Sequence, residues 1–469
     1  MEGNDFLGEE TSNFVQRYEK MLRNRTKDYF EPDAIELIAE HYLQQEKYKK
    51  AESAIQFGLE MYPQHVGFWV KLAEVYLHTD KYNLALTELD KAAIYEPCNA
   101  EVYLLKGEVL LGLEDPVEAK IWFDKAIQYT DELTDCLFEI GFIHQDNDLF
   151  SEAIHYFKEI IKLDPANEQA YYEAANCLDL MNKFDEAIAL LNQLIDLEPY
   201  NATAWYNLGV IHTKLNHFKE AIDAFDFCLV IDDSYTVAKF NKANALVELE
   251  QFDEAIKTYQ EVIEDEGEDG ITLCNLAGCF ERKGDYDQSR ALYKKASLVN
   301  PNLAEAWFGI GLTLFKDDKG KDALQFFKRA VLLETDNIEY LMVLAECEYA
   351  LDKTDDAIGT FEKVTELDPS FAEAWIDWSY VLYKSADYAG AEKLLKTALT
   401  FNPESFACYY RLALVLYKSG KTKESLVQFE KALQLNFEEH NHLFETNPEF
   451  ALIPEFIQMI DTYRPKSIE

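Results

Sequence analysis

A small residue recurs every 34 positions along this chain, twelve times, with no insertion or deletion. Each member is Ala, Gly or Ser, and the series runs Ala39, Ala73, Gly107, Gly141, Ala175, Gly209, Ala243, Ala277, Gly311, Ala345, Ser379, Ala413. A second series of small residues keeps the same period from Ala51 to Ser425. A fixed period of this length predicts a solenoid of stacked units, each in contact with its neighbours. A solenoid offers extended surface rather than an enclosed reaction chamber.

The spacing of the apolar residues predicts two helices in every unit. When each unit is numbered from 1 to 34, starting at Pro32, the small residues fall at positions 8 and 20, and large apolar residues such as Trp205 and Phe225 fall at positions 4 and 24. Positions 4, 7, 8 and 11 share one face of a helix, and positions 20, 24 and 27 share one face of a second helix. Seven units carry proline at position 32, which ends the second helix because proline lacks an N–H group. We expect the two helices to be antiparallel and to meet closely at positions 8 and 20.

Two short motifs carry a family resemblance. Residues 205–209 match a W-x2-L-G pattern, and residues 323–327 match an A-x3-F pattern. In these motifs and in its period the chain resembles the tetratricopeptide repeat family. The resemblance implies an all-α fold, a right-handed α-solenoid or superhelix of twelve 34-residue helix-turn-helix repeats. It also implies that the first helix of each repeat lines the concave face. The strict regularity and short ends suggest a stand-alone array of bacterial type.

The repeats leave a short segment at each end of the chain. We expect residues 1–31 to form an N-terminal leader with a capping helix, residues 32–439 to form the twelve repeats, and residues 440–469 to form a C-terminal capping helix and tail. Phe14, Tyr18 and Met21 have roughly helical spacing, and the stretch from Phe450 to Tyr463 is apolar. Terminal units of a solenoid need such caps to cover their exposed apolar faces.

The charge of the chain restricts its partners. Its 44 Lys and Arg residues oppose 87 Asp and Glu residues, for a net charge of −43. This balance argues against nucleic acid as a partner and favours basic proteins or peptides, although solubility alone explains it equally well. No apolar run is long enough to insert into a membrane. The acidic start MEGNDFLGEE lacks the apolar core of a secretory signal, so we expect a cytoplasmic protein.

One candidate binding surface is rich in amides and aromatic rings. The family resemblance implies that positions 2, 5, 6, 9, 12 and 13 face the concave groove. The candidate peptide-binding residues at positions 5, 6 and 9 are Asn176, Asn207, Asn241, Asn244, Asn275, Tyr172, Tyr206 and Phe240. An Asn amide both donates and accepts, so a row of them can pair with a peptide backbone whatever its sequence. The row resembles the asparagine ladder of O-linked N-acetylglucosamine transferase, but asparagine and tyrosine are also common family residues at these positions.

A second candidate surface is acidic. Carboxylates occupy groove positions of the first four repeats, and the residues are Glu40, Glu74, Glu101, Glu108, Asp135 and Glu139. Such a lining suits a segment rich in Lys or Arg, while an ordinary solvated face is the alternative.

Repeat 7 interrupts the apolar pattern. Lys239 replaces the aromatic residue at position 4, and Lys242 replaces the apolar residue at position 7. The acidic end of the repeat carries Gly267 at position 32, where seven repeats have proline, and Gly270 three residues later. Because two lysines on a packing face weaken the stack unless their charged ends reach water, we expect a flexible joint near residues 236–270.

The sequence carries no recognisable catalytic, cofactor-binding or metal-binding motif, such as H-E-x-x-H or G-x-x-x-x-G-K-[ST]. We therefore expect a protein-protein interaction scaffold or adaptor, not an enzyme, that binds a partner segment in its concave groove. One alternative is a chaperone-like holder of basic or unfolded clients, and another is a self-associating structural array. Neither the partner nor the oligomeric state follows from the sequence.

Overall fold

The computed structural model describes residues 2–464, which form 27 α-helices, one 3-10 helix and no strand. The predicted all-α repeat fold is confirmed. The chain divides into two compact units, a first unit of residues 1–232 and a second unit of residues 233–469. None of the helices in the described range combines the length and the apolar character needed to cross a bilayer.

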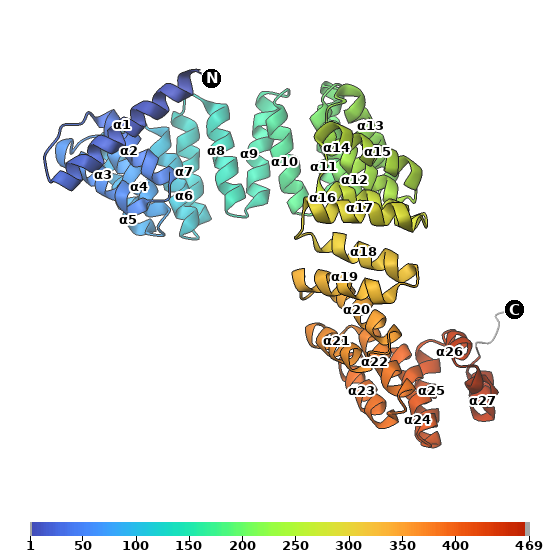
Figure 1. Cartoon of the computed structure of the whole chain (residues 1–469). Helices are drawn as coiled ribbons and strands as arrows, with labels where there is room; N and C mark the ends of the chain where they lie inside the picture. The colour runs from blue at the N-terminus through green and yellow to red at the C-terminus, as the bar shows by residue number, and fades with distance from the viewer. Residues whose placement is uncertain (1, 465–469) are drawn as a thin grey trace. The chain divides into compact units, whose positions relative to one another are not determined.

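The first unit contains a leading helix, α1 (Glu2–Asn24), and six antiparallel helix pairs (Figure 1). The first helix of each pair is called helix A and the second helix B. The A helices are α2 (Pro32–Gln44), α4 (Val66–Leu77), α6 (Ala100–Gly112), α8 (Leu133–Asp146), α10 (Glu168–Leu180) and α12 (Ala202–Lys214). The B helices are α3 (Tyr48–Met61), α5 (Tyr82–Tyr95), α7 (Pro116–Tyr129), α9 (Phe150–Leu163), α11 (Phe184–Leu197) and α13 (Phe218–Ile231).

The second unit repeats this arrangement six times and ends in shorter elements. Its A helices are α14 (Thr236–Glu248), α16 (Gly270–Arg282), α18 (Ala304–Lys316), α20 (Ile338–Ala350), α22 (Ala372–Lys384) and α24 (Phe406–Lys418). Its B helices are α15 (Phe252–Glu266), α17 (Tyr286–Val299), α19 (Gly320–Leu333), α21 (Thr354–Leu367), α23 (Tyr388–Phe401) and α25 (Thr422–Leu435). The last elements are α26 (His440–Thr446), η1 (Pro448–Leu452) and α27 (Pro454–Tyr463).

Each A helix passes into its B helix through a residue in the left-handed backbone region. This residue is at position 15 of every repeat, and its φ is positive in all twelve. Nine of the twelve are Asp, Asn or Glu, Gly284 and Gly420 are glycines, and Ala386 has φ +61°. Short polar residues and glycine tolerate this conformation, which ends the helix and lets the chain reverse.

Side chains at two repeat positions fix the start of several A helices. Asn201, at position 34, accepts a hydrogen bond from the backbone N–H of Ala204 at 2.9 Å and so caps α12. The indole Nε1 of Trp205, at position 4, donates to the carbonyl of Pro199 at 3.0 Å. Equivalent bonds join four other pairs, namely Tyr103–Pro97, Trp307–Pro301, Trp375–Pro369 and Tyr409–Pro403. The bond to the proline carbonyl explains why Trp and Tyr suit position 4.

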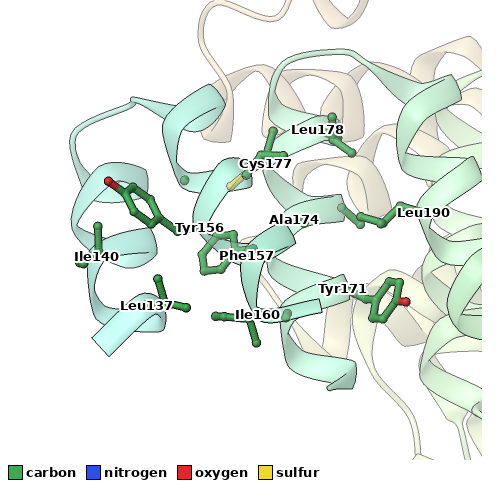
Figure 2. Close-up of a cluster of buried hydrophobic side chains, with 14 of the residues drawn as sticks. Leu137, Ile140, Tyr156, Phe157, Ile160, Tyr171, Ala174, Cys177, Leu178 and Leu190 are labelled. Atoms are coloured by element: carbon green, nitrogen blue, oxygen red, sulfur yellow. The ribbon is translucent and has the colours of Figure 1, made fainter. Parts of the chain in front are cut away.

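Buried rings and small residues build the core between helices. Figure 2 shows one such cluster, in which Phe157 and Ile160 of α9 lie between residues of α8 and α10. Where position 8 is glycine, it faces the phenylalanine ring at position 24 of the same repeat; a Cβ on Gly141, for example, would lie 2.5 Å from Phe157 Cε1. The small residue at position 20 lies close to the backbone of position 8. In repeat 12, Ser425 Oγ donates to the carbonyl of Ala413 at 2.7 Å.

Additional elements cover the ends of the two units. In the first unit, Tyr18 of α1 is buried, and its ring meets that of Phe30 edge-on at 6.1 Å. In the second unit, the buried ring of Phe456 in α27 stacks on Phe429 of α25 at 4.5 Å. Apolar side chains of both units are thus shielded at the chain ends.

Candidate peptide-binding surfaces

A cavity of about 260 Å³ lies in the first unit where α10 and α12 meet. It is lined by Tyr172, Ala175, Asn176, Asp179, Leu191, Tyr206, Asn207, Val210 and Ile211. Four of these are residues predicted from the sequence, two tyrosines and two asparagines. Residues 172, 176 and 179 share one face of α10 because they are spaced by four and three positions. Helix periodicity therefore brings these side chains together.

The two amides of this cavity are available for a ligand. Asn176 is exposed and Asn207 half-buried, and neither side chain has a hydrogen-bond partner within residues 2–464. Each can offer one carbonyl oxygen and two N–H donors. Such groups match the alternating donors and acceptors of an extended peptide backbone.

Tyr172 forms a fixed wall of the cavity. Its hydroxyl lies 2.7 Å from Oδ1 of Asn201, the residue that caps α12, and 3.2 Å from Oε2 of Glu168. Burial raises the pKa of Tyr172 well above its usual value, so the phenol stays neutral and can donate. The ring is therefore held by the helix cap rather than left mobile.

Asp179 is a cavity residue that the sequence reasoning missed. Its Oδ2 accepts from Lys214 Nζ at 2.5 Å, while its Oδ1 is buried and has no hydrogen-bond partner among the described residues. Asp179 and Lys214 occupy positions 12 and 13 of their repeats, so the repeat numbering alone could have placed both on the groove face. An unpaired carboxylate oxygen in this cavity is a strong acceptor for a peptide N–H.

The amides of the second unit are arranged differently. Asn244 Oδ1 accepts from the hydroxyl of Tyr259 at 2.5 Å, and it lies 3.3 Å from Nδ2 of Asn275. Phe240 meets Tyr259 edge-on at 5.9 Å, and Asn241 lies half-buried one turn before Asn244. Asn244 and Asn275 thus join neighbouring repeats to each other, which leaves fewer groups of these two amides for a ligand than the sequence suggested.

The acidic residues of the first four repeats form a mixed lining. Glu40, Glu101, Asp135 and Glu139 are exposed, whereas Glu74 and Glu108 are partly buried. Burial raises the pKa of Glu108 to about 7, and the nearby Glu74, Asp146 and Glu139 add to the rise. Lys71, at position 6, lies among these acids with its Nζ 3.0 Å from Glu74 Oε1. The lining is therefore less uniformly acidic than predicted, but its carboxylates are close enough to repel one another.

The predicted joint in repeat 7 contains partners for its charges. Lys239 Nζ lies 2.5 Å from Oδ2 of Asp265, and only 15% of the lysine side chain is exposed. Lys242 is half-buried on α14. Gly267 has φ +90° and ends α15, whereas Gly270 is buried at the start of α16, where a Cβ would lie 3.1 Å from Leu303. The two glycines thus have different reasons: Gly267 has a backbone conformation that favours glycine, and Gly270 allows close packing against Leu303.

Fold and surfaces together define a class of protein, the α-solenoids built from 34-residue helix pairs. Models of the tetratricopeptide repeat match residues 42–109, 100–132, 240–301, 280–337, 314–376 and 376–438. The chain belongs to the tetratricopeptide repeat family. A model described as anaphase-promoting complex, cyclosome, subunit 3 matches residues 146–228.

Curated relatives share part of the chain. Tetratricopeptide repeat protein 8 of Caenorhabditis elegans is 24% identical over 170 residues, which is 36% of this chain and 34% of that protein. A TPR repeat-containing protein of Methanocaldococcus jannaschii is 27% identical over 188 residues, 35% of this chain and 32% of that protein. This chain therefore spans about a third of the length of these relatives. The solved structure of yeast Tom70 is 14% identical, covers 92% of this chain and 94% of its own, and gives a TM-score of 0.41. The family places this chain among protein-interaction scaffolds in general.

Proposed function

We propose that the chain is an interaction scaffold whose cavity between α10 and α12 binds an extended segment of a partner protein. The observation that carries the proposal is the set of unpaired groups in one cavity, the amides of Asn176 and Asn207 and the buried Oδ1 of Asp179. These groups can bond to a peptide backbone, and the rings of Tyr172 and Tyr206 can pack against its side chains. Each neutral hydrogen bond is worth about 0.5–1.5 kcal/mol.

Affinity purification of partners by the full-length protein tests this proposal. Wild type would be compared with the double variant Asn176→Ala/Asn207→Ala and with Asn192→Ala, which truncates an exposed asparagine on α11. We expect the double variant to lose partners that the control retains. Equal recovery of every partner by all three proteins would refute the assignment of this cavity.

A basic partner for the acidic lining is a second candidate. The mutual repulsion of Glu74, Glu108 and Glu139 favours it, since a Lys or Arg side chain would relieve that repulsion. A lysine-rich peptide should then bind more tightly at low than at high ionic strength, and less tightly to a variant with these three residues changed to Gln. The chaperone-like alternative would show the same salt dependence with many unrelated peptides, and a self-associating array would show mass that rises with concentration. We assign no catalytic step and no cofactor, and we retain the expectation of a cytoplasmic location.

A further inference from the structure

A separate groove lies in the second unit between α21, α22 and α23, which are orange in Figure 1. Its volume is about 500 Å³. Its apolar lining consists of Trp375, Trp378, Leu382, Leu394 and Phe401. Half of the Phe401 side chain is exposed to solvent. Its polar lining includes Glu362, Thr365 and Glu366 of α21 and Lys393 and Thr397 of α23, so the groove uses residues of two B helices.

Trp378 is the unusual member of this lining. It occupies position 7, where none of the other eleven repeats has an aromatic residue. Its ring stacks on Trp375 with centroids 6.0 Å apart. Trp375 Nε1 donates to the carbonyl of Pro369, but Trp378 Nε1 is buried and has no acceptor in the described part of the chain. A buried N–H without an acceptor destabilises the protein, and an acceptor supplied by a ligand would remove that penalty.

The groove continues into a positively charged hollow. Lys393 and Thr397 line both the groove and a second hollow of about 580 Å³, which is also lined by Lys396, Lys421 and Glu392. Glu392 accepts from Lys396 at 2.7 Å and from Lys421 at 2.6 Å. Lys393 is exposed and has no ion-pair partner within residues 2–464. The second hollow thus carries three lysines and one glutamate, whereas the two glutamates that line the groove itself, Glu362 and Glu366, belong to α21.

We propose that this groove binds an acidic peptide segment that carries one bulky apolar side chain. The apolar side chain lies between Trp375, Leu394 and Phe401, where it replaces water against exposed ring surface. A backbone carbonyl of the segment accepts from Trp378 Nε1. Acidic residues then follow over Lys393, Lys396 and Lys421, and the same lysines repel a basic segment. This binding is independent of the cavity between α10 and α12.

Selection from a random peptide library tests the proposal with the full-length protein. Wild type, the double variant Lys393→Glu/Lys396→Glu and the control Lys321→Glu would be used in parallel, because Lys321 is an exposed lysine on another B helix, α19. We expect wild type and control to enrich peptides in which Phe, Leu or Trp precedes Asp or Glu, and the double variant to lose them. Synthetic copies of those peptides should bind the double variant about tenfold more weakly, and more weakly at higher salt.

Two further variants separate the contributions. Trp378→Phe keeps an aromatic ring but removes the N–H donor, so it should weaken binding by about fivefold. Asn176→Ala/Asn207→Ala should leave these peptides bound, which distinguishes this groove from the first-unit cavity. Selection of the same peptides by Lys393→Glu/Lys396→Glu, or no enrichment of acidic peptides by wild type, would overturn the proposal. Dimerisation that this double variant abolishes would also overturn it and assign the groove to a second copy of the chain.

Discussion

Gly209 lies so close to Phe225 that a Cβ at residue 209 would be 2.6 Å from Cε1 of the ring. Both residues belong to repeat 6, at positions 8 and 24. The four repeats with glycine at position 8 all carry phenylalanine at position 24. In these four repeats the ring lies so close that a larger residue at position 8 would require it to move. In repeats 10 and 12, by contrast, Ala345 and Ala413 accompany Phe361 and Phe429, so the close approach belongs to the glycine repeats alone.

Gly209→Ala should destabilise the first unit by about 1–3 kcal/mol, because the added methyl group overlaps the Phe225 ring. Repeat arrays need not unfold in one step, so hydrogen exchange of α12 and α13 is the suitable measurement. Gly359→Ala is the matched control. A Cβ there meets no atom within 4 Å, and alanine favours a helix over glycine by about 0.5–1 kcal/mol. Faster exchange in both variants would contradict the argument from overlap with the ring.

Ala386→Gly should stabilise the second unit by about 1 kcal/mol. Ala386 has φ +61°, and the left-handed conformation costs an L-residue with a Cβ roughly 1–2 kcal/mol, part of which is offset by the greater unfolded-state freedom of glycine. Gly420→Ala, at the same position of the next repeat, should have the opposite effect. Thermal unfolding and exchange near α22 and α23 would check both signs.

The stability of the first unit should fall as pH rises from about 4.5 to about 7. The pKa of Glu108 is raised to about 7 in the folded state, so the fold binds this proton more tightly than the unfolded chain does. Over this window the unfolded chain loses the proton first, which favours unfolding as pH increases. Glu108→Gln should flatten this part of the stability profile, whereas Glu60→Gln, at an exposed residue of α3, should leave it unchanged. A wild-type slope preserved in Glu108→Gln would reject the assignment.

Two arginines of the second unit should respond differently to replacement by methionine. Arg290 donates to the carbonyl of Thr313 at 3.0 Å and to Asp317 at 2.5 Å, so Arg290→Met should cost about 2 kcal/mol. The guanidinium of Arg411 lies 5.1 Å from the Tyr380 ring, and its buried Nη1 has no hydrogen-bond acceptor among the described residues. Arg411 also faces the carboxyl of Asp377, whose pKa burial raises to about 6. Arg411→Met should therefore cost little below pH 6, where Asp377 is protonated, and more above it, where the aspartate is left without a counter-charge. Denaturant unfolding measures the loss of stability in each variant. Equal losses for Arg290→Met and Arg411→Met would contradict this reasoning.

The ion pair between Lys239 and Asp265 offers a test of the joint predicted in repeat 7. Asp265→Asn removes the carboxylate that Lys239 contacts and leaves a mostly buried ammonium without it. We expect faster hydrogen exchange in α14 and α15 than in wild type, and Glu264→Gln, at the neighbouring exposed residue of α15, serves as the control. Equal protection of repeats 6, 7 and 8 in wild type would show that no joint exists there.

The fold could be predicted from the sequence because several independent features of the repeat indicate the same structure. The period, the small residues and the helix spacing all predict helix pairs, and the structure contains them. The binding surface was less predictable, since position alone does not determine what a side chain does. Asn176 and Asn244 both occupy position 9, yet the first is free and the second accepts from Tyr259. The difference comes from position 24, where repeat 5 has Leu191 and repeat 7 has a tyrosine hydroxyl.

Ion pairs between charged side chains are the second reason why the binding surface could not be predicted from the sequence. Lys71 and Asp179 lie at groove positions, but Lys71 forms an ion pair with Glu74 and Asp179 forms one with Lys214. Pairing of this kind depends on rotamers and on the distance between helices, and the sequence period carries neither. Of the five asparagines predicted to line the groove, only Asn176 and Asn207 of the first unit have side chains without a hydrogen-bond partner among residues 2–464.

The hydrogen bond from Trp205 to Pro199 bears on how such a chain can be divided or recombined. The donor lies in one 34-residue repeat and the acceptor in the preceding one. A fragment cut at Ala202, where α12 begins, would lose both this acceptor and the Asn201 cap. A module that can be transplanted whole therefore begins at the proline before helix A, so duplication or exchange of repeats should preserve that boundary.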